Sequence, residues 1–524
     1  MPGDLDVRFR DELNAEERFL NVFSTIKLHV GLGFDSDQVI SALVGLLTEP
    51  EPTFDSNWRP AVALIHECTH FWQWIGTTLG FHTTRLTMAQ SVLSRLTLKL
   101  LDEAGVSAFP VPLEDLPLSK IPPSARDDIS YARDMWQCIE RYKTALHGYR
   151  DVCVGHEEFA KRVFPTAYKA LIRFDCLNQQ FGDGSATDYN LAESKLADYS
   201  FHLTPSRTVS PQLTLGRGVQ YSLGGRVLLE GAACCQEGKL LNHLRNLGTL
   251  SSADWRARAL QIGESFYGTS FALLHENLPR KTSAIAALPY LLDLAFMGLF
   301  DPLYVVPFAD TIAWRDVHPG HRFLRILNAT KELGLPPDES PPDAYLDLVE
   351  HICRREQWPT PSALSEQTER FQPSKSELHE WTGPGFFNTN PFFEFRRRHC
   401  AAMRTRLANP SLLINCADGF RDLFGSDPTA YNLLRPSVLF ADHSGFQDME
   451  MLSFFMFHYL MRCIFVGTCS GLDTEKLLPT GFRPSFQSSK DGTIDDDPGL
   501  FEYMVWRKVE FPKERLVPLD EWQG

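Results

Sequence analysis

The chain has 524 residues, of which 43% are hydrophobic, enough for a large buried core organised as two or three domains or as one elaborated unit. Its formal net charge of −15 would repel a phosphate backbone, so nucleic acid is not expected as a partner. The eleven cysteines follow no repeated spacing and the N-terminus carries no apolar signal segment, so we expect a cytoplasmic protein with reduced thiols.

The N-terminal part of the chain predicts a strand and two helices. Alternating side chains over Val22–Val30 indicate the strand. A cluster of helix-capping residues then precedes a helix over Val39–Leu47. A second, strongly apolar helix is expected over Ala61–Ile75, with Gly76 or Gly80 at its end.

The segment from about residue 84 to residue 300 is predicted to be almost entirely helical, because apolar residues recur there at spacings of three and four. We therefore expect an α+β protein that is predominantly helical, with a short N-terminal sheet and a large helical elaboration. The expected helices are Leu86–Leu101, Ser124–Tyr149, His156–Leu177, Asn190–Phe201, Gly224–Leu241, Ala253–Leu274 and Ser283–Leu299.

Two stretches interrupt the helical pattern in the second half of the chain. The first is the proline-rich segment 334–342, and the second is the polar, proline-containing segment 357–390. Further helices follow, and the chain ends in a strand-like tail, Phe501–Val509. These breaks divide the chain into a first part, 1–330, a proline-rich connecting region, 331–390, and a C-terminal helical region of unknown role, 391–524.

Two long apolar runs, Ala286–Phe308 and Met451–Val466, raise the question of membrane insertion. The first contains Pro289 and Asp293, and the second contains a histidine and an arginine. These interruptions favour buried core helices, so no membrane span is expected.

The most informative string of the chain is His66-Glu67-Cys68-Thr69-His70, within the predicted Ala61–Ile75 helix. Residues four apart on a helix lie about 40° apart on the same face, so both imidazoles can reach one metal ion. Glu67 then lies next to the first imidazole, where it can act on a water molecule at the metal. This pattern is typical of a hydrolytic zinc site.

The surroundings of this string strengthen that interpretation. The remaining sides of the helix are apolar, so the two histidines and the carboxylate must be largely buried. Burying such groups without partners costs several kcal/mol, and a metal ion would satisfy all three. The alternative is a pair of buried histidines hydrogen-bonded to backbone carbonyls, with Glu67 in a salt bridge.

A catalytic zinc ion usually takes three protein ligands, so two histidines need a further carboxylate or histidine. The best candidate is Glu230, because small residues directly after it would let its helix approach the first one closely. Its alternative role is a salt bridge with Arg226, one turn earlier. Rival ligands are Glu193, and Asp198 together with His202, for which a surface side-chain contact is the simpler interpretation.

The segments His66-Glu-Cys-Thr-His70 and Leu229-Glu-Gly-Ala-Ala233 together resemble the gluzincin branch of the zincin metallopeptidases. The resemblance implies a zincin-like core within residues 1–330, with His66, His70 and Glu230 as zinc ligands and Glu67 as the general base. It covers only these two short segments. The separation between His70 and Glu230 is longer than in the best-known members, so a helical insertion is expected between them.

The predicted reaction is the hydrolysis of an amide bond in a peptide or protein substrate, by water activated on Zn²⁺ with Glu67 as general base. Gln73, nearly one turn beyond His70, is a candidate for a hydrogen bond near the ligands, although a solvent-facing glutamine is equally consistent with the sequence. An oxyanion-stabilising donor is also expected, and the sequence does not select among Tyr221, His202, Tyr267 and His275.

Two other functions remain open from the sequence. Glu230 and Glu237 share one helical stripe, which is compatible with a di-metal carboxylate oxidase in a helical bundle. However, Glu-x-x-His occurs only at Glu67–His70, without the second copy that such sites use. The other possibility is a non-catalytic interaction protein with a degenerate zinc site and a protein partner.

Overall fold

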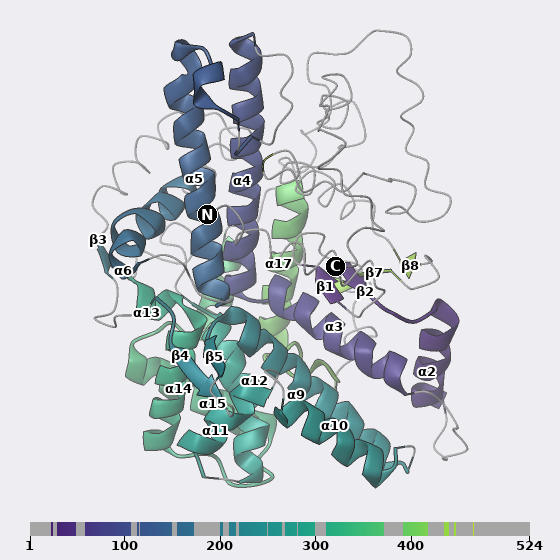
Figure 1. Cartoon of the computed structure of the whole chain (residues 1–524). Helices are drawn as coiled ribbons and strands as arrows, with labels where there is room; N and C mark the ends of the chain where they lie inside the picture. The colour runs from purple at the N-terminus through teal and green to yellow at the C-terminus, as the bar shows by residue number, and fades with distance from the viewer. Residues whose placement is uncertain are drawn as a thin grey trace.

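The computed structural model describes residues 22–24, 29–48, 58–105, 113–114, 116–148, 155–171, 200–202, 209–215, 219–248, 250–264, 268–279, 281–298, 311–370, 391–417, 434–439, 445–446 and 465. These residues are predominantly helical (Figure 1). Within them, no helix combines the length and the apolar character that crossing a membrane requires.

The N-terminal strand prediction was wrong in one respect. Instead of one strand over Val22–Val30, the chain forms two short strands, β1 (Val22–Ser24) and β2 (His29–Gly31). They pair antiparallel, with Val22 opposite Gly31, so the chain reverses direction between them. The four residues between the strands, Thr-Ile-Lys-Leu, contain no glycine, proline, asparagine or aspartate, so nothing in the sequence marks the reversal.

This hairpin belongs to a four-stranded sheet with the order β1-β2-β7-β8. β7 (Ser437–Leu439) runs parallel to β2, and β8 (Gly445–Phe446) pairs antiparallel with β7. The sheet therefore joins the N-terminal segment to residues more than 400 positions later in the sequence.

The two helices predicted next are confirmed as α2 (Ser36–Thr48) and α3 (Arg59–Ile75). Pro60 lies in the first turn of α3, where its missing N–H costs nothing. Gly76 ends the helix, and its backbone N–H donates to the carbonyl of Trp72. Nearly all of α3 is buried, as its apolar composition predicts.

A long helical pair follows α3. α4 (Thr78–Glu103) and α5 (Pro123–His147) lie side by side (Figure 1). α4 begins well before the predicted Leu86, only two residues after α3. A Cβ atom at Gly80 would lie 1.9 Å from the carbonyl oxygen of Trp74, so this tight connection requires glycine there.

The next segments differ in part from the prediction. The helix expected to start at His156 does so, as α6 (His156–Glu158), and it continues through a π-helical turn, η3 (Phe159–Val163), to residue 171. By contrast, the described end of the helix expected over Asn190–Phe201 is a strand, β3 (Ser200–His202), parallel to β6 (Thr311–Ala313). Serine and phenylalanine are tolerated in strands as well as in helices, so the pairing with β6 decides the conformation.

A hairpin and four helices come next. The hairpin consists of β4 (Gln212–Leu215) and β5 (Val219–Ser222). Two helices replace the single helix expected over Ala253–Leu274. Gly268 stands directly before the second of these helices, and glycine disfavours a helix interior. The four helices are α9 (Gly225–Asn246), α10 (Ser252–Glu264), α11 (Thr269–Asn277) and α12 (Thr282–Phe296).

The proline-containing second half holds five further helices among the described residues. Four of them have proline as their first residue, where its fixed φ suits helix initiation. Two of them, α15 (Pro342–Glu356) and α16 (Pro361–Arg370), lie within the predicted connecting region 331–390. The Phe501–Val509 tail lies outside the described residues. The five helices are α13 (Trp314–Val317), α14 (Pro319–Leu333), α15 (Pro342–Glu356), α16 (Pro361–Arg370) and α17 (Pro391–Ala408).

One large apolar core connects these elements. It contains Phe71 of α3, Leu228 of α9, Leu291 of α12, Ile352 of α15 and Phe395 of α17. Helices from all three predicted parts of the chain thus bury side chains against one another.

The end of α3 is anchored by polar groups of α17. His399 Nδ1 lies 2.7 Å from the carbonyl oxygen of Ile75, and Arg406 Nε donates to the carbonyl of Gly76 over 2.6 Å. The guanidinium of Arg406 also forms a buried, bidentate ion pair with Asp293 of α12, at 2.6 and 2.8 Å. These bonds satisfy carbonyls at the C-terminal end of α3 that have no partner within the helix.

Buried neutral histidines predict that the protein loses stability in mild acid. Burial lowers the pKa of His399 to about 4, and it lowers the pKa of His82 and His318 well below the usual value. Below pH 6.5 the unfolded chain takes up protons on these residues and the folded chain does not, so the free energy of unfolding decreases as the pH is lowered. Each group contributes up to about 1.4 kcal/mol per pH unit, in the case of His399 down to about pH 4.

Denaturant midpoints measured between pH 6.5 and pH 5 test this expectation, because His66, whose pKa is raised to about 10, is protonated in the folded protein and largely so in the unfolded chain over that range. The midpoint should fall steadily, and His399→Gln should flatten part of the slope. A stability that does not change over this range would contradict it.

Candidate metal centre

The predicted site lies where α3 crosses α9, and these two helices pack closely along their lengths (Figure 1). Of the small residues after Glu230, the glycine has a different role from the one predicted for it. A Cβ atom at Gly231 would lie 2.1 Å from Ser270 Oγ, so this glycine makes room for α11 rather than for α3.

His66, His70 and Glu230 converge at this crossing. Glu230 Oε2 lies 3.2 Å from His66 Nε2 and 3.3 Å from His70 Nε2. One nitrogen from each ring and one carboxylate oxygen all lie within 4.8 Å of one another. The structure therefore brings together the three residues that the sequence analysis chose as metal ligands, from helices 160 or more positions apart.

The spacing of these donor atoms suits a zinc ion. Two donors that each lie about 2.0–2.1 Å from a tetrahedral zinc ion are separated by about 3.3 Å. The measured nitrogen–oxygen separations match that value. In addition, Nε2 of both rings faces the carboxylate, so both histidines offer the same kind of donor to a shared position.

The electrostatics of the group depend on these contacts. Burial opposes a charge on both His66 and Glu230, but the surrounding hydrogen bonds and charges together outweigh it. At His66 these come from Glu230, Glu237 and Glu67, and at Glu230 they come from the two histidines. As a result, the pKa of His66 is raised to about 10 and the pKa of Glu230 is held well below its usual value. The proton that His66 shares with the Glu230 carboxylate thus compensates part of the negative charge of Glu230, which a bound cation would compensate fully.

Glu67, the expected general base, is buried on α3 with 7% of its surface exposed. Its negative charge is close enough to His66 to contribute to the raised pKa of that histidine. The two ligand histidines and Glu230 keep 10–18% of their side-chain surface, so the centre is partly accessible to solvent.

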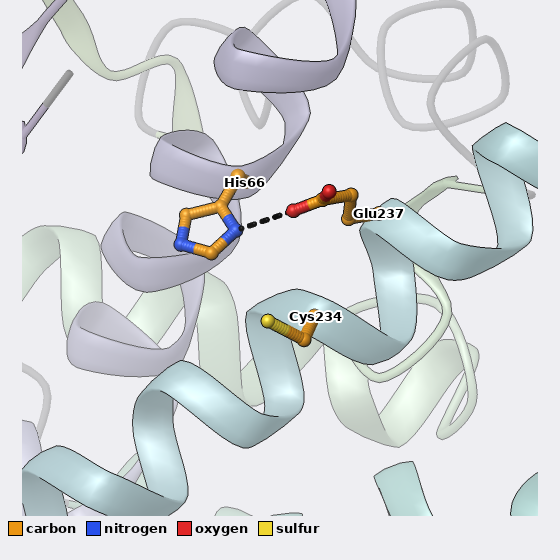
Figure 2. A group of neighbouring side chains, drawn as sticks. All are labelled: His66, Cys234 and Glu237. Carbon is orange, nitrogen blue, oxygen red and sulfur yellow. Dashed lines mark hydrogen bonds and ion pairs between the residues drawn. The ribbon is translucent and has the colours of Figure 1, made fainter. Parts of the chain in front are cut away.

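A second group of donors shares His66. Cys234 and Glu237, one and nearly two turns after Glu230 on α9, lie beside the same imidazole ring (Figure 2). Glu237 Oε2 is 3.3 Å from His66 Nδ1, and the Cys234 sulfur points toward the same ring. Burial raises the pKa of the Cys234 thiol far above its usual value, with the charge of Glu237 adding to the effect.

Glu237 is also the centre of an ion pair with α10. Arg258 Nε lies 2.5 Å from Oε1, and Arg258 Nη2 lies 3.0 Å from Oε2. The carboxylate itself is 1% exposed, whereas Arg258 keeps 34% of its side-chain surface. An arginine at the surface is thus linked through a buried glutamate to the first motif histidine.

The salt bridge considered for Glu230 with Arg226 does not form: among the described residues, the partners of the Glu230 carboxylate are the two histidines. Gln73 is buried, and its Oε1 has no hydrogen-bond partner among those residues. His275 lies on α11, and its buried Nδ1 likewise has none.

The other candidates stay predictions. Tyr221 and His202 lie in β5 and β3, and the placement of their side chains is not described. Glu193, Asp198 and Tyr267 lie outside the described residues.

The link from His66 through Glu237 to Arg258 was not predicted from the sequence. The spacing of seven between Glu230 and Glu237 did place both carboxylates on one stripe of α9, and that was a usable signal. For Arg258 there was no local signal, because its partner lies on another helix.

Comparison with known proteins adds no relative. No protein-family model matches the chain, and no similar protein was found among curated proteins or solved structures.

Proposed function

We propose that the protein is a zinc-dependent hydrolase, a metallopeptidase of zincin-like type that cleaves amide bonds in peptides or proteins. The observation that carries the proposal is the convergence of His66 Nε2, His70 Nε2 and a Glu230 oxygen at separations that fit one ion. Two imidazoles and one carboxylate form the ligand set of several catalytic zinc sites and leave a position for water.

The chain's own groups have distinct tasks in this proposal. His66, His70 and Glu230 would hold the zinc ion, which when bound would lower the pKa of water and polarise a carbonyl. Glu67 accepts a proton from the attacking water and delivers it to the leaving amine. Glu67 directly follows His66 on α3, so it is held next to the first of the proposed ligands.

The arrangement of Glu237 argues against the di-metal oxidase. Such a centre would need Glu237 as a further metal ligand, but its carboxylate is paired with Arg258 and His66 Nδ1. A guanidinium beside a metal-bridging carboxylate would compete with the second cation for the same oxygens.

Removal of the metal tests the proposal. The zinc-loaded protein should hydrolyse a mixture of unstructured peptides, with new termini identified by mass spectrometry. Dialysis against a chelator should abolish cleavage, and one equivalent of zinc should restore it. A protein that binds zinc and never cleaves any peptide or amide substrate would contradict the hydrolase, whereas one that binds no zinc would contradict the metal centre itself.

A further inference from the structure

We infer that Glu237 is a positioning residue for the metal centre and that Arg258 fixes its orientation. The inference rests on the proposed zinc site and concerns residues outside the ligand set. It couples α10, an outer helix, to the first motif histidine on α3.

The two ring nitrogens of His66 face different carboxylates. Nε2 faces Glu230. Nδ1 faces Glu237, as Figure 2 shows. If Nε2 is a ligand, a neutral imidazole carries its proton on Nδ1 and can donate it to Glu237 Oε2. Glu237 would then select the tautomer and fix the plane of the ring, as carboxylates beside metal-bound histidines do.

Arg258 of α10 holds the Glu237 carboxylate in place. With 1% of its side chain exposed, an ionised Glu237 needs a cationic partner. Arg258 supplies two donors, one to each carboxylate oxygen. The guanidinium therefore fixes the orientation of the carboxylate, with Oε2 toward His66.

The contacts of Glu237 exclude a second metal ion in the group formed by His66, Cys234 and Glu237. His66 Nδ1 cannot bind a cation while it donates a proton to Glu237, and the two Glu237 oxygens already face Arg258. Cys234 then occupies the remaining side of the ring as a neutral, packed thiol (Figure 2).

The test measures zinc affinity by competition with a chromophoric chelator in four full-length variants. Glu237→Gln removes the charge, and Arg258→Met removes its partner. Both should weaken zinc binding about 10- to 100-fold. Arg258→Lys retains a cation and should recover most of the affinity. Glu140→Gln is the matched control, because Glu140 is a buried carboxylate that pairs with Lys143 and Gln90 instead, and it should bind zinc as the unaltered protein does.

Two further readouts separate positioning from general stability. The visible spectrum of the Co²⁺-substituted protein should change in Glu237→Gln and not in Glu140→Gln. The denaturant midpoint of the metal-free forms reports any loss of folding alone.

The results that would overturn the positioning role of Glu237 differ from those that would overturn the proposed function. Tight zinc binding by the unaltered protein with equally tight binding and an unchanged Co²⁺ spectrum in Glu237→Gln and Arg258→Met would overturn the positioning role only. Failure of the unaltered protein to bind zinc would overturn the zinc site and this inference together.

Discussion

Replacing Glu67 by glutamine is expected to lower kcat for peptide hydrolysis by about 10²- to 10⁴-fold, while the protein retains its zinc. The amide has nearly the same shape as the carboxylate but cannot accept the proton of the attacking water. Since Glu67 is not one of the three converging donors, the zinc dissociation constant should change little. Steady-state kinetics and metal analysis of the same purified sample measure both quantities.

The control for this prediction is Glu140→Gln, a buried glutamate of α5 whose replacement should leave kcat near its original value. If Glu67→Gln keeps more than about a tenth of the turnover, Glu67 is not the general base. If it loses its zinc as well, the role of Glu67 is to hold the centre together, and the proton transfer falls to another group.

Replacing Arg406 by leucine is expected to destabilise the fold by about 3–5 kcal/mol, because it leaves Asp293 buried and without its cation. The same change removes the donor to the Gly76 carbonyl at the end of α3. The shift in denaturant midpoint measures the loss. Arg354→Leu, at an exposed position of α15, should change stability by no more than about 0.5 kcal/mol.

A double variant separates the charge from the packing. Asp293→Leu combined with Arg406→Leu removes both charges, so it should recover much of the stability lost in the single variant. A single variant that is as stable as the original protein would show that the pair does not anchor α3.

The helices that carry the site could be predicted because their signals are local. The apolar surroundings of His66 and His70, with Pro60 before them and Gly76 after them, define α3 from the sequence alone. The stripe through Glu230 likewise defines α9. How α3 and α9 pack against each other, including the approach of Glu230 to both imidazoles, depends on tertiary contacts that no local sequence pattern specifies.

The errors in the prediction arose where tertiary contacts decide the structure. The Val22–Val30 alternation continues through a reversal, and Ser200 and Phe201 join a strand because β6 offers a partner. The pair Asp293–Arg406 and the pair Glu237–Arg258 were not foreseen for the same reason: each joins two different helices, and a single sequence does not show which charges will meet.

X-ray absorption at the zinc edge of the zinc-loaded protein tests the central claim most directly, because two overlapping donor groups share His66. The account predicts one zinc ion per chain with only nitrogen and oxygen neighbours at about 2.0–2.1 Å, two of them imidazoles. A sulfur neighbour at about 2.3 Å would place the ion with Cys234 and Glu237 instead, and a chain that retains no zinc would contradict the metal centre altogether.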